Sequence, residues 1–237
     1  MSDTTDVKNG PVALRRSAGI GSAKNIAFIA IMGALGNVLS WLSISLAPFL
    51  PEVPLGPLTV SIALDLSHLT TFIAALYGGP AVGGLVGLVG GAVAANVFGF
   101  SSGNLVTGFT LPIGKALTGL TAGLLMRALG LGVNDYGLLL IASKLQSAEE
   151  RGLLLRIYRI LLVPSTVLSY LPEAVFTVFI FLSVIPFVYG IPVVIFYGIV
   201  TGILVKAFIE MFVEGAILAA LSASQSFTIS INNFFKA

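Results

Sequence analysis

Six apolar stretches dominate this sequence, and each is about as long as a helix that crosses a lipid bilayer, roughly 20 residues. They cover residues 24–46, 59–77, 81–97, 105–126, 160–184 and 193–221. The segments between them are rich in proline, glycine or charged residues, as is typical of loops. The pattern predicts an all-α integral membrane protein built as a bundle of six transmembrane helices.

Composition supports lipid as the solvent of this chain. Only 9% of its 237 residues are charged, whereas a soluble domain carries about 25%. The net charge of +2 comes without a dense basic patch, which argues against nucleic-acid binding. Cysteine is absent and histidine occurs once, so thiol chemistry and His-rich metal or haem sites are excluded. We therefore expect no cofactor, no metal site and no catalytic residues.

The charged residues divide the chain and orient it. We expect a cytoplasmic N-terminal tail over 1–23, a membrane domain over 24–222 and a C-terminal tail over 223–237. A charged segment, 127–159, interrupts the membrane domain and is expected outside the bilayer, with a short amphipathic helix from Tyr136 to Arg151.

Basic residues fall on one side of the six predicted spans. Ten of the 12 lie there: Lys8, Arg15, Arg16, Lys24, Arg127, Lys144, Arg151, Arg156, Arg159 and Lys236. The opposite loops, 47–58, 98–104 and 185–192, contain no Lys or Arg. Since basic loops stay in the cytoplasm, both termini are expected inside the cell.

Polar and aromatic residues within the spans are the candidate binding groups, because each is costly in hydrocarbon. At 1.5 Å of rise per residue, nine of them fall at mid-depth or in the outer half. They are Trp41, Asp65, His68, Asn96, Asn104, Lys115, Tyr170, Glu173 and Tyr197. This placement predicts a substrate pocket open to the outside, with the proline-rich segment 47–58 as its lid.

Structural roles compete with binding at several of these positions. Lys115 and Glu173 could neutralise each other, since charges inside a membrane usually pair. Lys206, Glu210 and Glu214 share one helix face by their i, i+4, i+8 spacing, and they fit a structural ladder as well as a ligand site.

Small residues form a second pattern. Gly79, Gly83, Gly87 and Gly91 recur every fourth residue, a spacing that allows helix backbones to approach closely, and we expect internal packing there. An alanine stripe on the first span lies in its cytoplasmic half, away from the predicted pocket, where a partner membrane protein could dock. Its residues are Ala23, Ala27, Ala30 and Ala34.

Three segments resemble the substrate-binding subunits, or S components, of energy-coupling factor (ECF) transporters. They are AFIAIMGALG in the first span, residues 62–91, and TLPIGKALTGLTAGLL in the fourth span. Together with six spans and internal termini, the likeness covers most of residues 24–222. The charged segment 127–159 is longer than this family's pattern.

The resemblance implies a function in the cell membrane of a prokaryote. The chain would capture a small water-soluble vitamin or related nutrient, and would not be an enzyme. A membrane coupling subunit and two cytoplasmic ATPases would be its partners, with Ala27, Ala30 and Ala34 docking on the coupling subunit. The chain lacks a GxxxxGK[ST] phosphate-binding loop, which fits ATP hydrolysis on another subunit.

Two alternatives remain open. A stand-alone secondary transporter could carry protons on Glu173 or Glu210. An intramembrane hydrolase could use Ser67 with His68 and Asp65, although the sequence has neither HExxH nor GxSxG. The residues leave the substrate unidentified, with a flat flavin-, pyrimidine- or pyridoxine-like heterocycle as one class that fits the acid, base and aromatic groups.

Overall fold

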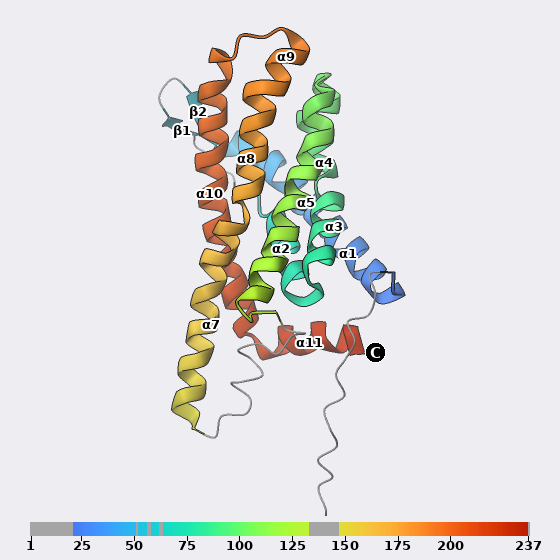
Figure 1. The fold of residues 1–237 in the computed structure, drawn as a ribbon, viewed down its shortest axis with the longest axis vertical. Helices are drawn as coiled ribbons and strands as arrows, with labels where there is room; N and C mark the ends of the chain where they lie inside the picture. The colour runs from blue at the N-terminus through green and yellow to red at the C-terminus, as the bar shows by residue number, and fades with distance from the viewer. Residues whose placement is uncertain (1–20, 51, 56–57, 62–63, 133–146, 237) are drawn as a thin grey trace, which may run out of the picture.

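The computed structural model describes residues 21–50, 52–55, 58–61, 64–132 and 147–236. Most of its helices run up and down along one long axis, whereas the first helix is strongly tilted and the last one lies across one end (Figure 1). Five helical stretches of the described chain are long and apolar enough to cross a membrane, as in a multi-pass membrane protein. They are Ala23–Phe49, Pro80–Ser102, Leu105–Ala128, Ala148–Tyr189 and Val194–Ala223.

These stretches contain most of the named helices. The first is α1 (Ala23–Leu46) with a short 3-10 turn (Ala47–Phe49), and the second is α3 (Pro80–Gly90), α4 (Ala92–Phe98) and the turn Phe100–Ser102. The third is α5 (Leu105–Ala128). The fourth joins α7 (Ala148–Ser169), α8 (Leu171–Phe179), a π-helical turn (Ile180–Val184) and α9 (Ile185–Tyr189), and the last is α10 (Val194–Ala223).

The prediction of a membrane-spanning helix over 59–77 is wrong, because this segment forms a strand followed by a short helix. Its first part forms β2 (Leu58–Ser61), which pairs antiparallel with β1 (Glu52–Leu55) in a hairpin. Only α2 (Ser67–Gly78) is helical. Twelve residues rise about 18 Å, which is too short for a hydrocarbon core of about 30 Å.

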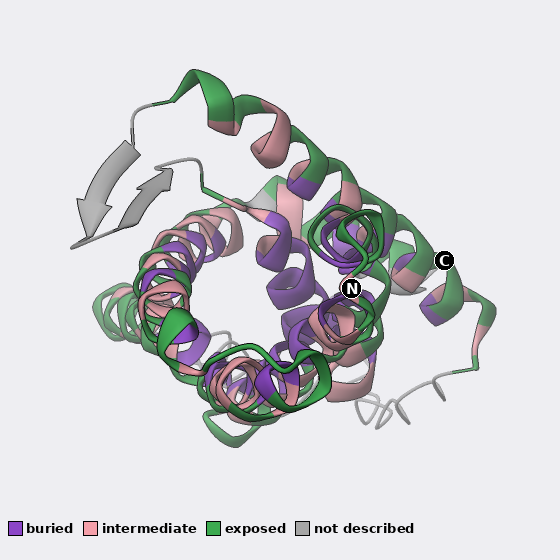
Figure 2. Cartoon of the chain, turned by 90° about the horizontal axis from the view of Figure 1, so that it is seen from above, coloured by how far each residue is buried: buried purple, intermediate pink, exposed green. Residues whose placement is uncertain are grey.

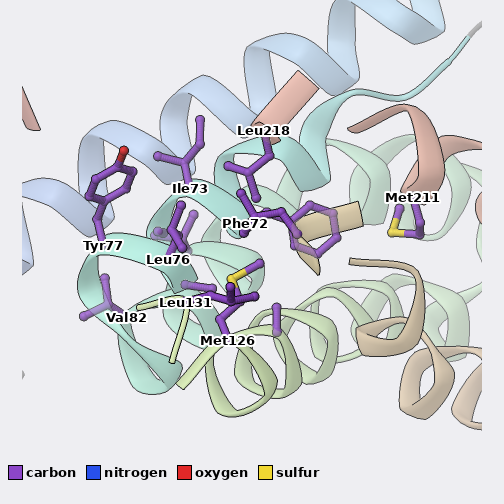
Figure 3. Packing of buried hydrophobic residues seen from close by; sticks show 14 of the residues in the cluster. Phe72, Ile73, Leu76, Tyr77, Val82, Met126, Leu131, Met211 and Leu218 are labelled. Carbon is purple, nitrogen blue, oxygen red and sulfur yellow. The ribbon is translucent and has the colours of Figure 1, made fainter. Parts of the chain in front are cut away.

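Helix α2 is instead a core element. Ten of its 12 residues are buried, and it packs against α1, α3, α5 and α10. The largest side chains of the apolar core, including Phe72, Leu76, Met126 and Leu218, gather around it (Figure 3). Seen from above, buried residues occupy the sides of the helices that face one another (Figure 2). A helix enclosed in this way contacts protein rather than lipid, so it can carry polar residues.

Glycines bring α3 and α5 together, which confirms the expected internal packing for Gly83, Gly87 and Gly91 but not for Gly79, where an added Cβ atom would contact nothing. A Cβ atom on Gly83 would meet the backbone of Gly119, and one on Gly87 would meet the backbone of Lys115. Gly123 lies equally close to Pro80. These contacts fix the position of Lys115 along the axis of α5 relative to α2 and α3.

Asn37 of α1 bridges the interruption between α3 and α4. Its amide nitrogen donates to the carbonyl of Val89 at 2.8 Å, and its carbonyl oxygen accepts from the N–H of Val93 at 2.9 Å. The helix breaks between these residues, at Gly91. One side chain therefore satisfies two backbone groups at the interruption.

We predict that Asn37→Leu destabilises the protein by about 1–3 kcal/mol, because both backbone groups lose a partner in an apolar setting. The measurement is the unfolding midpoint of the purified protein in detergent. Thr201→Val is the control, since the exposed Thr201 hydroxyl bonds only within its own helix. Equal midpoints for the two variants would contradict the bridging role.

The fourth stretch extends further than predicted. Its expected start was Ile160, but α7 begins at Ala148, where the Ser147 hydroxyl caps the helix by accepting from the N–H of Glu150. Its 42 residues span about 60 Å, roughly twice the hydrocarbon thickness. The charged first turns of α7 therefore extend beyond the bundle (Figure 1). Most of the amphipathic helix expected from Tyr136 lies outside the described residues.

The C-terminal tail contains a helix, α11 (Gln225–Lys236), which lies across one end of the bundle (Figure 1). The hydroxyls of Tyr77 and Thr228 are 3.2 Å apart, and the ring of Phe227 packs edge-on against Tyr77 at 6.2 Å. The ring centroid of Phe234 of α11 also lies 5.8 Å from that of Phe28, near the start of α1. The beginning of the membrane domain and the C-terminal helix thus meet at the same end.

Candidate functional site

Polar side chains from five helices and the segment before α2 meet inside the bundle. Glu173 lies in the first turn of α8, just after the α7–α8 junction, and is 7% exposed. Its Oε2 atom is 3.3 Å from Nε2 of His68 and accepts a 2.5 Å hydrogen bond from Thr118. This contact joins α8 to α2 and α5.

Lys115 contacts the residues at the start of α2. Its Nζ atom lies 3.6 Å from Oδ2 of Asp65 and donates to the hydroxyl of Ser67. Asp65 also accepts from the N–H of Ser67 at 3.0 Å and from the hydroxyl of Ser40 at 3.2 Å. Asp65 therefore does two tasks, since it satisfies the first turn of α2 and neutralises Lys115.

Helix α10 adds two carboxylates. Oε1 of Glu210 accepts from the N–H of Asp65 at 2.7 Å and lies 3.7 Å from Nζ of Lys206. Glu214, one turn further along, is fully buried and lies within electrostatic range of Asp65, Glu210 and Lys115. Of the expected ladder, Lys206 and Glu210 form a pair, and Glu214 lies near enough to Glu210 to interact with it electrostatically.

Aromatic rings flank this region. Tyr170, which is 2% exposed, packs edge-on against Phe208 with centroids 5.4 Å apart. The imidazole of His68 lies 6.3 Å from the ring of Phe72. We call the set the inner polar cluster, and its members are Ser40, Asp65, Ser67, His68, Lys115, Thr118, Tyr170, Glu173, Lys206, Glu210 and Glu214.

Five of the nine predicted binding residues belong to the inner polar cluster: Asp65, His68, Lys115, Tyr170 and Glu173. The structure does not bring the other four into it. Trp41 and Tyr197 are 60% and 58% exposed, and Asn96 is exposed at the end of α4. Asn104 caps α5, where its side chain accepts from the N–H of Thr107 at 3.0 Å.

The pairing expected between Lys115 and Glu173 is replaced by two others. Lys115 pairs with Asp65, and Glu173 pairs with His68. Sequence reasoning also missed Ser40 and Thr118, whose hydroxyls bond to Asp65 and Glu173. A lone hydroxyl in an apolar helix gives little signal, because it can bond to its own backbone instead.

The hydrolase alternative would need Ser67 to pair with His68, and the structure shows no hydrogen bond between these two side chains. The Ser67 hydroxyl accepts from Lys115, whereas Nε2 of His68 faces Glu173. Among the described residues, no group of three or more His, Asp or Glu side chains is placed to hold a metal ion.

Comparison with known proteins adds one structural likeness. No family model matches the chain, and no curated protein matches it. A solved structure of the S component of a bacterial ECF transporter is 20% identical in sequence. The match covers 90% of this chain and 98% of that one, with a TM-score of 0.37.

Proposed function

We propose that this protein is the substrate-binding subunit of an ECF-type transporter. It captures a small water-soluble vitamin or related nutrient outside the cell and delivers it inward with a membrane coupling subunit and two ATPases. The proposal rests on the sequence resemblance over residues 24–222. The observation that carries it is the convergence of Asp65, His68, Lys115 and Glu173 within an apolar bundle.

The inner polar cluster supports the binding role by its construction. Its side chains come from α1, α2, α5, α8 and α10, so a ligand bound there contacts elements distant in sequence. Such a ligand would couple its own binding to the relative positions of these helices. We place its entry at the end of the β1–β2 hairpin and α9, which is the extracellular end by the distribution of basic residues.

The alanine stripe supports the docking role. Ala27, Ala30 and Ala34 are all exposed on α1. Gly33 and Gly36 lie on the other side of the same helix, where they contact Val89 of α3 and Thr70 of α2. Helix α1 therefore has one small-residue face used within the bundle and a second that is free to receive another membrane helix.

We predict that Ala30→Trp with Ala34→Trp abolishes uptake in cells and leaves ligand binding to the purified subunit unchanged. Two indoles on this face would hold a partner helix several ångströms away. Val175→Trp is the control, since Val175 is 70% exposed on α8. Uptake that survives the double substitution would remove this face from the docking surface.

The energy source of uptake distinguishes an ECF-type transporter from a proton-driven secondary transporter. ATP depletion should stop uptake in cells that also express the coupling subunit and ATPases, because hydrolysis drives release. The secondary transporter would instead use Glu173 or Glu210 as a proton carrier, and its uptake would persist without ATP and stop with a proton uncoupler.

A further inference from the structure

The charges of the inner polar cluster do not balance. Four carboxylates belong to it, those of Asp65, Glu173, Glu210 and Glu214, against the ammonium groups of Lys115 and Lys206 and the imidazole of His68. Three of the acids each have one of these bases within 4 Å. Glu214 is the acid left over.

Glu214 is also left without hydrogen bonds. It is 0% exposed, and neither of its carboxylate oxygens makes a hydrogen bond among the described residues, although the backbone N–H of Leu69 and the ammonium group of Lys115 lie near it. A buried carboxylate without a cation is costly, so such groups are retained where something compensates them. The nearest internal cation, Lys115, is already engaged by Asp65 and Ser67.

A second buried acceptor or donor is free in the same region. Nδ1 of His68 has no hydrogen-bond partner among the described residues, and His68 is only 7% exposed, so water does not readily reach this atom. His68 and Glu214 both lie within electrostatic range of Asp65 and Glu210. Two buried polar groups without hydrogen-bond partners among the described residues thus lie near the same two carboxylates, and a ligand that donates N–H bonds would satisfy them.

The neighbouring aromatic rings fit a cationic ligand. Tyr170 lies near both Glu173 and Glu210 and packs against Phe208. The faces of aromatic rings attract ammonium and other nitrogen cations, most strongly where water is excluded. Carboxylates together with aromatic rings favour an organic cation over a bare metal ion, which prefers several oxygen ligands.

We propose that the transported ligand carries a positively charged nitrogen group, and that Glu214 with Glu210 supplies its counter-charge. This inference rests on the proposed uptake function and narrows its substrate to cationic nutrients. Lys115 and Lys206 then serve to hold Asp65 and Glu210 in place rather than to bind an anionic ligand.

The test measures thermal stabilisation of the purified subunit in detergent by a panel of compounds. Thiamine, pyridoxamine and choline are the organic cations, pyridoxine, riboflavin and nicotinamide the neutral compounds, and biotin and pantothenate the anions. Sodium chloride against potassium chloride tests an inorganic cation. Pyridoxamine and pyridoxine form a matched pair that needs no variant, because they differ by an ammonium and a hydroxyl group.

We expect stabilisation by an organic cation, and a loss of at least tenfold in its affinity in Glu214→Gln. Glu150→Gln is the control, since Glu150 is exposed at the start of α7. Mass spectrometry of the ligand extracted from purified protein gives a readout independent of the panel and of the variant's folding, and it should find a cation.

Each other outcome overturns the assignment. A neutral or anionic ligand, or a sodium-specific response alone, would contradict an organic cation and leave the uptake function standing. An affinity for the cation that is unchanged in Glu214→Gln would remove Glu214 from the site. Absence of any extracted ligand, together with absence of uptake in cells, would instead contradict the proposed function itself.

Discussion

Gly87→Ala is expected to destabilise the bundle by about 1–3 kcal/mol, although glycine to alanine within a helix ordinarily stabilises by up to about 1 kcal/mol. The added Cβ atom would lie closer than 3.0 Å to the backbone of Lys115, and no rotation of a side chain can relieve that contact. Helices α3 and α5 must separate, which also displaces Lys115 from Asp65.

Gly84→Ala is the matched control on the same helix. A Cβ atom there would lie 3.4 Å from the carbonyl oxygen of Ala116, which is ordinary contact. We expect this variant to be as stable as the wild type or more stable. Thermal or denaturant unfolding in detergent compares the two, and equal stabilities would contradict the close backbone packing of α3 on α5.

Lys115→Met is expected to cost about 1–3 kcal/mol of stability, because it removes the cation that faces Asp65 and leaves a carboxylate that is only 25% exposed without its ion-pair partner. The methionine side chain has nearly the volume of lysine, so packing changes little. Ligand affinity should also fall by more than tenfold, about 1.4 kcal/mol, since Asp65 no longer holds its place beside Glu210.

The double variant Asp65→Asn with Lys115→Met distinguishes stability lost through an unpaired charge from stability lost through altered packing. Neutralising both partners removes the uncompensated carboxylate, so most of the lost stability should return. Asparagine also keeps an oxygen that can accept from the N–H of Ser67. A double variant as unstable as the sum of the two single variants would show that the pair does not interact.

Much of this architecture could be predicted from hydropathy and charge alone, because lipid tolerates few alternatives to a helix. The two stretches that hydropathy misplaced have physical reasons. Residues 59–66 are apolar enough for a span, but Leu58–Ser61 pairs with β1 in a hairpin. The charged first turns of α7 were expected outside the bilayer, with a separate amphipathic helix ending at Arg151, but the Ser147 cap and two glutamates begin a helix that runs on into the apolar stretch.

Several residues of the candidate site could be predicted from the sequence. Which of these residues contact one another could not. Asp65, His68, Lys115 and Glu173 could be found because charge is scarce in the spans. Their partners depend on how α2 is rotated and where it begins, and periodicity does not determine either for so short a buried helix. Helix α2 begins at Ser67 rather than at residue 59, so Asp65 lies just before the helix, where it pairs with Lys115.

The decisive experiment for the substrate-binding function is to identify the ligand that accompanies the protein. The subunit purified from cells in mild detergent should retain or tightly bind one small water-soluble nutrient, found by mass spectrometry after denaturation. We expect a single nutrient that is lost from Lys115→Met and retained by Ala30→Trp with Ala34→Trp. Purified protein that carries no small molecule and binds none of a vitamin panel would contradict it.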